Sequence, residues 1–483
     1  MGGGIRMEWH GALAELTDKE VWVTGYGRAG KSLVAALQRL GARVIVIDEN
    51  EMGGPSEIPI FRTIPDQIVA QLIVTSPGWR PGHEIFRVAA RCGVRVIGDI
   101  ELAWMVDQER ARAEHRAPPQ WLAVTGTNGK TTTVGMLESM LIADGLRAIA
   151  CGNVGLPVID AVMAEEPYDV LAVEFSSFEI HWSQNSKPFA TVLLNIAEDH
   201  LDWHGSYADY AETKVQLLAR SRYSIYNADD ENTFAALVGV STGERISFTL
   251  ETPRPGQLGV VEEFLVDRAF VDNPNVEAGP MATLADVKPF APHNVANALA
   301  AASLARAVGV SLEAISRGLN QFQSGGHRIE QIARIENVDY VDDSKATNPH
   351  AAAASLRSFP SIVWIAGGLA KGASMERLVV ENAKRLRGAV LIGQDRGLIR
   401  ESLEKYAPEI TIIDIEINDV ALSKKDRAII LMDRVVGAAA GLSAPGDTVL
   451  LAPACASMDQ FESYAERGEL FSQAVAKLSG VHP

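Results

Sequence analysis

The stretch from Gly126 to Thr132 carries residue types that bind a nucleotide phosphate. It follows an apolar run at 121–124 and precedes an amphipathic run at 134–143, a pattern that predicts strand, glycine loop and helix. Such a loop faces an anion with backbone N–H groups and the positive helix end, while a lysine reaches the terminal phosphates and a threonine hydroxyl binds Mg²⁺. The spacing departs from the usual one, because Val124 stands where a glycine is expected six residues before Lys130. The context favours ATP or GTP binding over an ordinary turn. The predicted phosphate-binding residues are Gly126, Thr127, Asn128, Gly129, Lys130, Thr131 and Thr132.

A second glycine loop lies near the start of the chain. Gly25, Gly27 and Gly30 follow an apolar run at 21–24, a helical run follows at 31–40, and another apolar run at 44–47 ends in Asp48. This order is the dinucleotide fingerprint, with glycines for close phosphate approach and an acid for a ribose hydroxyl. By itself it points to NAD. Such a match can also serve another nucleotide or only pack a helix on a strand, so these alternatives stay open. A further strand and loop at 73–78 is typical of the edge of a ligand crevice.

Acidic and histidine side chains follow the next predicted strands. Glu174 ends the strand at 170–173 and, because carboxyl ends of parallel strands meet at one edge, it could reach a Mg²⁺ held by the phosphates. A helix-capping glutamate is the plainer alternative. Residues 198–204 hold three acids and two histidines, which favours a metal or acid–base site, although a solvated loop explains most such clusters. Lys214, in a helix predicted at 207–219, is by pattern only a solvated lysine.

Amide and basic side chains complete the candidate set. Asn294 and Asn297 share one face of a predicted alanine-rich helix, where their amides can contact a purine; capping of the helix by Asn294 is an equal alternative. In the last third of the chain, polar loops at 342–348, 367–372 and 453–461 each follow a predicted strand. Basic residues there supply positive charge for carboxylates and phosphates, unless the three loops are unrelated. These basic residues are Arg328, Lys345 and Lys371.

The whole chain has the composition of an ordinary cytoplasmic enzyme. Its 483 residues are 47% hydrophobic and 22% charged, enough for about three domains with cores of their own. The formal charge of −17 argues against nucleic acid or an anionic membrane as the partner. Three scattered cysteines indicate a reducing compartment, and neither a signal core nor a membrane span is seen. We expect a cytoplasmic protein that binds no nucleic acid and does not insert into a membrane.

Strands alternate with helices along the chain, which predicts an α/β fold with parallel sheets throughout. Short strands punctuated by Pro and Gly between about 243 and 289 predict a small antiparallel excursion. The charged segment at 107–119 and the sequence Ser324-Gly325-Gly326 predict two boundaries. We predict three domains, at residues 1–112, 113–324 and 325–483. The first is expected to be Rossmann-like, the second a P-loop ATPase-type parallel sheet, and the third Rossmann-like again.

In this order, the motifs resemble those of the ATP-dependent Mur ligases of bacterial peptidoglycan synthesis, over about residues 20–475. The shared motifs are TGTNGKTT at 125–132, VEFSSF at 173–178, NIAEDHLD at 195–202, HNVAN at 293–297, HR at 327–328 and DSKATN at 343–348. The segments GYGRAGKS, GGLAKG and APACASMDQF resemble the members that add D-glutamate to UDP-N-acetylmuramoyl-L-alanine. The Asp-Asn-Pro-Arg motif of the diaminopimelate-adding members is not found; the sequence at 272–275 comes close but lacks the arginine and lies in the central block.

The resemblance implies a role for each matching residue, with ATP and two Mg²⁺ ions as cofactors. The catalytic residues would be Lys130, Glu174, His200 and Lys214. The metal ligands would be Thr131, Glu174, His200 and a carbamylated Lys214. ATP would also contact Asn294, Asn297, Arg328 and Asp343. The UDP substrate would contact Gly25, Gly27, Arg28, Ala29, Gly30, Asp48, Ser76 and Asn153. D-glutamate would contact Lys345, Thr347, Lys371, Ser457 and Tyr464.

The implied reaction, carried out by a monomer, is acyl activation. The substrate carboxylate attacks the γ-phosphate of ATP, and the amine of D-glutamate then displaces phosphate from the acyl phosphate. The chain departs from the family at Glu49-Asn50, where Thr-Arg is common, at Ala291, a frequent glycine, and at Tyr464, a frequent phenylalanine. Other interpretations are another amide ligase of the superfamily, adding L-alanine or a dipeptide or resembling folylpolyglutamate synthase, an NAD-dependent dehydrogenase, and a non-catalytic nucleotide-binding scaffold.

Overall fold

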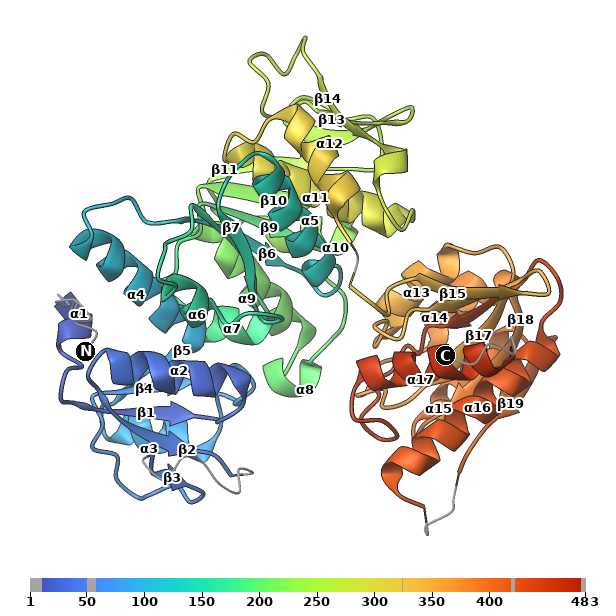
Figure 1. Ribbon diagram of the computed structural model, residues 1–483, viewed down its shortest axis with the longest axis horizontal. Helices are drawn as coiled ribbons and strands as arrows, with labels where there is room; N and C mark the ends of the chain where they lie inside the picture. Colours follow the sequence, from blue (N-terminus) through green and yellow to red (C-terminus); the bar gives the residue numbers. More distant parts are fainter. Residues whose placement is uncertain (1–10, 50–57, 324, 418–421, 479–483) are drawn as a thin grey trace. The chain divides into compact units, whose positions relative to one another are not determined.

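The computed structural model describes residues 11–49, 58–323, 325–417 and 422–478, which form three β-sheets (Figure 1). Asn50 and Ser324, both used in the sequence predictions, lie outside the described residues. The chain divides into two compact units. The first holds the first two sheets, through residue 196, 203–287 and 295–322. The second holds the third sheet, from residue 323 onward, with the short segments 197–202 and 288–294.

The first sheet is fully parallel, in the order β3-β2-β1-β4-β5. Its strands are β1 (Glu20–Thr24), β2 (Arg43–Ile47), β3 (Ile60–Phe61), β4 (Leu72–Thr75) and β5 (Arg95–Gly98). The helices of this block are α1 (Gly11–Ala14), α2 (Arg28–Arg39), α3 (Glu84–Arg91) and α4 (Asp99–Ala113).

The second sheet has nine strands, in the order β14-β13-β12-β11-β10-β9-β6-β8-β7. They are β6 (Gln120–Thr125), β7 (Ala148–Gly152), β8 (Val170–Glu174), β9 (Ala190–Leu193), β10 (Tyr223–Asn227), β11 (Glu244–Phe248), β12 (Gln257–Val261), β13 (Phe264–Asp267) and β14 (Gly279–Thr283). The helices are α5 (Lys130–Ala143), α6 (Val158–Val162), α7 (Ser177–Trp182), α8 (Leu201–His204), α9 (Tyr207–Ala219), α10 (Glu231–Leu237), the 3₁₀ turn η1 (Leu284–Asp286), α11 (Pro292–Ala307) and α12 (Leu312–Gln321).

The third sheet has six strands, in the order β15-β16-β20-β17-β18-β19. They are β15 (Glu330–Ile335), β16 (Val338–Asp342), β17 (Ile362–Gly367), β18 (Leu386–Ile392), β19 (Thr411–Asp414) and β20 (Thr448–Leu451). The helices are α13 (Pro349–Arg357), α14 (Glu376–Asn382), η2 (Ala383–Arg385), α15 (Arg396–Tyr406), α16 (Lys424–Leu442) and α17 (Tyr464–Leu478).

Each sheet is buried on both faces, as near-continuous apolar strands predict. Successive side chains of a strand point to opposite faces, so neighbouring residues enter different cores. In β6, Leu122 and Val124 pack with α5, α11 and α12, whereas Trp121 and Ala123 pack in the core shared with the first sheet. In β17, Trp364 packs with α13–α15 and Ile365 with α16 and α17. Because both faces of each sheet are buried, the polar loops emerge at the ends of the strands.

The first and second sheets are joined within the first unit. Trp182 Nε1 of α7 donates to Trp79 O at 3.3 Å, and Asn185 Nδ2 donates to Glu101 Oε1 at 2.6 Å. A Cβ at Gly98, which precedes α4, would lie 2.7 Å from Cβ of Trp182. This close approach shows that the start of α4 is seated directly on α7.

One feature of the predicted architecture was wrong. The sheets are not parallel throughout, because β12–β13, β13–β14 and β15–β16 are antiparallel pairs. The small antiparallel excursion predicted between about 243 and 289 is confirmed by β12–β14, at 257–283. These strands extend the second sheet, because β11 and β12 continue the parallel ladder from β10. The structure confirms a mixed α/β fold with mostly parallel sheets, while the domain limits at 112/113 and 324/325 stay predictions.

Among the described helices, none has both the length and the apolar character that crossing a bilayer requires.

All three cysteines lie in described residues and are free thiols: Cys92 is exposed, whereas Cys151 and Cys455 are buried.

Candidate active site

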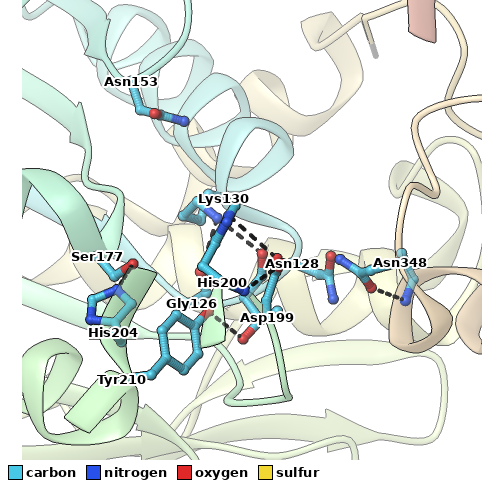
Figure 2. A network of polar contacts seen from close by, with 12 residues as sticks. Gly126, Asn128, Lys130, Asn153, Ser177, Asp199, His200, His204, Tyr210 and Asn348 are labelled. Carbon is cyan, nitrogen blue, oxygen red and sulfur yellow. Dashed lines mark hydrogen bonds and ion pairs between the residues drawn. The ribbon is translucent and has the colours of Figure 1, made fainter. Parts of the chain in front are cut away.

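The loop between β6 and α5 has the shape that the sequence predicts. Gly126 and Gly129 have φ of 153° and 86°, which only glycine adopts readily, and a Cβ at Gly129 would lie 2.4 Å from Asn297 Oδ1. The first helical residue is Lys130, whose Nζ donates to Gly126 O at 2.9 Å and to Thr127 O at 3.0 Å (Figure 2). A cationic group therefore lies over the loop at the helix N-terminus.

A second lysine reaches the same carbonyl. Lys214 of α9 is buried, with 1% exposure, and its Nζ donates to Gly126 O at 3.0 Å. The ammonium group also lies 4.6 Å from the ring centroid of Tyr210, and the Tyr210 hydroxyl is 2.9 Å from Thr127 Oγ1. Lys214 is thus not the solvated surface lysine that its pattern alone suggested. Two lysine side chains therefore donate to the loop, one of them from the protein interior.

Asn195, which follows β9, braces the loop from the neighbouring strand end. Its Oδ1 accepts from Asn128 N at 2.9 Å, its Nδ2 donates to Asn128 O at 3.1 Å, and its carbonyl accepts from Thr127 N at 3.0 Å. The loop backbone is fixed by a side chain 67 residues away in sequence.

Glu174 lies on the other neighbouring strand. It ends β8, is paired in register with Val124 of β6, and is 2% exposed. Its Oε1 accepts from Asn153 Nδ2 at 2.9 Å, and Asn153 N donates to Glu174 O at 3.1 Å. Glu174 does not cap a helix, because Ser176 and Glu179 form the capping box of α7. The carboxylate and Asn153 are therefore brought together beside the phosphate loop, as predicted for parallel strand ends.

A pair of buried acids lies below this edge, where α4 meets α7. Burial raises the pKa of Glu179 well above its ordinary value, and the neighbouring Asp99 carboxyl raises it further. Burial also raises the pKa of Asp99 to about 7. The two acids do not both ionise readily at neutral pH, because like charges in a low-dielectric site repel each other.

The two histidines of the acid-rich stretch have different partners. His200, at φ 52°, lies beside Asp199, with Nε2 3.6 Å from Asp199 Oδ2 and its backbone N donating to Asp199 Oδ1 at 2.9 Å (Figure 2). His204, in α8, has Nε2 2.8 Å from Ser177 Oγ. The predicted metal-binding role of His200 stays a prediction.

In the first sheet, the glycine loop is bound by an acid. Tyr26 N donates to Asp48 Oδ2 at 2.6 Å, and Ser76 Oγ donates to Gly25 O at 3.5 Å. A Cβ at Gly30 would lie 1.9 Å from Gly25 O, so glycine is needed for α2 to pack on the loop. Gly25, Asp48 and Ser76 meet at the ends of β1, β2 and β4. The other predicted contacts, Gly27, Arg28 and Ala29, lie at the start of α2, where Gly27 and Arg28 are exposed.

A cavity of about 750 Å³ lies between the first two sheets' loops and helices. It is formed by the loop that precedes α3 and by α7, α8 and α9. Trp203 provides an aromatic wall, and histidines, acids and Arg80 provide polar groups. The residues that line the cavity are Arg80, Pro81, Gly82, His83, His181, Trp203, His204, Asp209, Glu212, Thr213 and Gln216.

In α11, the two predicted asparagines are buried. Asn294 is the third residue of the helix, and its Nδ2 donates to Pro289 O at 3.0 Å. Asn294 therefore does not act as an N-cap, because a cap side chain accepts from a helical N–H.

The loops after β16, β17 and β20 meet at one end of the third sheet. Ala454 N donates to Ala346 O at 2.9 Å, and Leu369 and Ala456 form a bridge between the loops that carry Lys371 and Ser457. Lys345 Nζ lies 3.9 Å from the ring centroid of Tyr464. The five residues predicted to bind the amino acid, including Thr347, thus lie on connected segments.

Asp343 and Arg328 also belong to this edge. Burial raises the pKa of Asp343 to about 7, although its bond with Ser355 Oγ and the charge of Arg328 oppose the rise. Arg328 lies between His327 and Ile329, which both have positive φ. His327 Nδ1 is 2.6 Å from Asp342 Oδ2, and this hydrogen bond raises the pKa of His327.

Comparison with known proteins identifies the family. Residues 124–305 match the Mur ligase middle domain, and residues 327–455 match the Mur ligase, glutamate ligase domain. The chain is 50% identical to the UDP-N-acetylmuramoylalanine–D-glutamate ligase of Thermobifida fusca, over 96% of this chain and 100% of that one. The ligases of the same name from Streptomyces coelicolor and Mycolicibacterium smegmatis are 48% and 41% identical, with 99% of each covered. The chain belongs to the Mur ligase family.

Solved Mur ligase structures have the same three-domain fold. The pseudomurein peptide ligase type C from Methanothermus fervidus matches with a TM-score of 0.58 at 19% identity, over 95% of this chain and 100% of that one. The MurF ligase from Thermotoga maritima in complex with ADP matches with a TM-score of 0.55 at 17% identity, over 96% and 97%. At these identities the likeness concerns the fold alone.

Sequence patterns missed three residues whose side chains contact the phosphate loop or the acid-rich stretch. Asn195 stands in the NIAEDHLD motif, yet only His200 of that motif was given a role. Tyr210 precedes Lys214 by one helical turn, which was the available signal that the two side chains meet. Ser177 gave no signal of its pairing with His204.

Proposed function

We propose that this chain catalyses the ATP-dependent addition of D-glutamate to UDP-N-acetylmuramoyl-L-alanine, releasing ADP and phosphate. The observation that carries the proposal is the phosphate loop with Lys130 and Lys214 both donating to Gly126 O and Glu174 at the next strand end. Relatives up to 50% identical over the full length bear the name of this D-glutamate ligase and supply the choice of amino acid.

The residues at the loop suit ATP with Mg²⁺. Thr131 is the second residue of α5, next to Lys130, and Glu174 is a buried carboxylate; hydroxyl and carboxylate oxygens are the ligands Mg²⁺ prefers. When bound, the ion offsets negative charge on the phosphates. Nζ of Lys214 donates a hydrogen bond, so Lys214 could serve as a ligand only after carbamylation supplied an oxygen, and His200 would then complete the second ion's set.

The chemistry proposed for the chain's own residues is positioning and charge neutralisation. The alanyl carboxylate attacks the γ-phosphorus of ATP, and the bond to the ADP oxygen breaks, leaving an acyl phosphate. The amine of D-glutamate then attacks the acyl carbon, loses a proton, and inorganic phosphate leaves. Lys130 reduces the repulsion between the carboxylate and the triphosphate, and the helix N-terminus of α5 adds a positive dipole. Asn294, Asn297 and Asp343 would hold the adenosine, and Arg328 the phosphates.

The nucleotide-sugar substrate would extend from the first sheet to the second. Its UDP would lie at the loop of Gly25 and Asp48. The cavity lined by Trp203 is within the 300–1,000 Å³ typical of small-ligand sites, and an aromatic wall with several donors and acceptors suits a sugar. Asn153 would contact the sugar or alanyl part next to Glu174. A monomer acting in the cytoplasm is part of this proposal.

The test is phosphate release from ATP and Mg²⁺ with UDP-N-acetylmuramoyl-L-alanine and one amino acid at a time. D-glutamate should support release, whereas L-glutamate, L-alanine and meso-diaminopimelate should not. Release with a different amino acid alone would keep the acyl-phosphate reaction and reject the proposed amino acid. No release with any of them would reject the ligase proposal.

A further inference from the structure

Arg467 is a charged side chain in the interior of the second unit. It lies in α17, and 0% of it is exposed. Burial lowers the pKa of its guanidinium to about 10, so the group is still a cation at neutral pH. A buried charge is tolerated only when its hydrogen bonds compensate for lost hydration. The contacts of Arg467 must therefore explain why a cation is kept there.

Three N–H groups of Arg467 bond to two loops. Nε donates to Ser344 Oγ at 2.9 Å, Nη2 to Ser344 O at 2.8 Å, and Nη1 to Cys455 O at 3.2 Å. Ser344 follows β16 and Cys455 follows β20, and these strands are parallel neighbours. One planar group thus sets the spacing between the loops that leave two adjacent strand ends.

These loops and the start of α17 carry four of the five residues predicted to bind the amino acid. Lys345 follows Ser344 directly, Thr347 follows after Ala346, and Ser457 is separated from Cys455 only by Ala456. Ser344 Oγ also donates to Tyr464 O at 2.7 Å, and the Tyr464 ring lies under Lys345 Nζ. The hydrogen bonds of Arg467 therefore help to position each of these side chains.

Gly468 allows α17 to approach the same loop closely. A Cβ there would lie 2.2 Å from His327 Nδ1 and 2.4 Å from Asp342 Oδ2. These two atoms are hydrogen-bonded to each other, and Asp342 Oδ1 accepts from Ser344 N at 2.8 Å. Glycine at position 468 keeps this bonded group intact while its neighbour Arg467 reaches Ser344.

We propose that Arg467 is a positioning residue of the amino-acid subsite, which holds the 343–347 and 453–457 loops at the separation that a dicarboxylic amino acid requires. It acts through Ser344 and Cys455 and touches neither the substrate nor the reacting atoms. The inference rests on the proposed function, because the subsite is part of it. A lysine at this position keeps the charge but lacks the planar fork, so it cannot bond both carbonyls in the same directions.

Arg467→Lys tests the inference, with Arg110→Lys as the matched control. Arg110 is also a buried arginine that donates to backbone carbonyls, those of Val162 and Glu165, but in the first unit. Both variants should lower Tm. Only Arg467→Lys should raise KM for D-glutamate, by about tenfold as expected for a lost hydrogen bond to a charged group, with KM for ATP and for the UDP substrate unchanged. An unchanged KM for D-glutamate, or an equal rise in all three KM values, overturns the inference.

Hydrogen–deuterium exchange separates this inference from the proposed function. Arg467→Lys should speed amide exchange in both loops relative to β17 and β18, whatever the amino acid substrate is. Unchanged exchange in the loops rejects the positioning role even in an enzyme that uses D-glutamate, whereas a wild-type protein inert with D-glutamate rejects the proposed function instead. If Arg467→Lys does not fold, Ser344→Ala removes the acceptor of Nε and the hydrogen bond to Tyr464 O, and it keeps the Ser344 carbonyl to which Nη2 donates. That variant should raise KM for D-glutamate by a smaller factor, and an unchanged value would reject the inference.

Discussion

The two glycine loops of this chain have the same strand–loop–helix form but bind charged groups of opposite sign. In the loop at 25–30, a backbone N–H donates to the carboxylate of Asp48. In the loop at 126–129, a backbone carbonyl accepts from Nζ of Lys130 and from Nζ of Lys214. A carboxylate on the first loop disfavours a phosphate at that N–H and suits a hydroxyl or base donor, whereas the cation of Lys130 suits a triphosphate. The spacing of the glycines thus predicts the backbone conformation of a loop, and the neighbouring charges determine which ligand the loop binds.

The largest expected effect comes from the cation of the second loop. Lys130→Ala should lower kcat about 10³-fold, because a preorganised charge that faces the transition state is worth on the order of 10²–10³ in rate. The matched control is Lys31→Ala, the corresponding helix lysine of the first loop, which lies over the ring of Tyr26. Steady-state phosphate release measures both. A similar loss in the two variants would contradict the difference between the loops.

The next effect concerns the glycine before each helix. Gly129→Ala forces a side chain into left-handed backbone and against Asn297, and should cost about 1–2 kcal/mol of stability or more. Gly27 precedes α2 with φ −69°, and a Cβ there meets nothing within 4 Å, so Gly27→Ala should leave stability nearly unchanged. Urea unfolding of the two variants gives the comparison. An equal loss of unfolding free energy in the two variants would mean that the backbones of the two loops are equally strained.

Asp48, the acid bonded to the first loop, should affect binding of the UDP substrate but not the rate of the chemical step. Asp48→Asn replaces a charge-assisted bond to Tyr26 N by a neutral one, and KM for the UDP substrate should rise about tenfold. The value of kcat at saturating substrate should stay the same. A fall in kcat with unchanged KM would instead mean that Asp48 acts in the chemical step, as is proposed for the residues of the phosphate loop.

The smallest effect tests the contact between the two loop-bearing sheets. Burial raises the pKa of Asp99 to about 7 in the folded protein and holds that of Glu179 well above its ordinary value, so the folded state binds more protons than the unfolded state as pH rises above about 4, for Asp99 up to about pH 7. Stability from these acids is therefore present at low pH and is lost as pH rises through that window. From pH 5 to pH 8, Tm of Glu179→Gln should fall about 2–4 °C less than wild-type Tm. The exposed Glu313→Gln, as the control, should follow the wild type, and a Glu179→Gln curve parallel to it would contradict the prediction.

The spacing of neighbouring residues predicted the glycine loops, but it could not predict contacts between residues far apart in the sequence. The glycines and lysine at 126–130 lie close together in the sequence, in the loop and at the first residue of α5, so their conformation is a local property. The bond between Lys214 and Gly126 joins residues 88 apart, and only the pairing of β6 with β9 and the packing of α9 bring them together. Lys214 alone in sequence therefore resembled any surface lysine.

Two further misses have physical reasons of the same kind. The edge strand β15 was not predicted, because its residues Glu330–Ile335 are partly exposed and carry no apolar run. Arg467 lies next to Glu466 and two residues before Glu469 in a helix, a pattern typical of a solvated side chain. Its burial depends on Gly468, whose missing side chain lets α17 approach the loop at Ser344. The fold class followed from strand–helix alternation, but the side chains that connect distant loops could not follow from it.

The burial of two thiols gives the chain native reporters of local opening. Cys151 lies in the first unit and Cys455 in the second, and burial raises the pKa of both, that of Cys455 to about 12. Only a thiolate is alkylated rapidly, so a thiol reagent should first modify Cys92 in the folded protein. The slower labelling rates of Cys151 and Cys455 then measure how often each unit opens by itself.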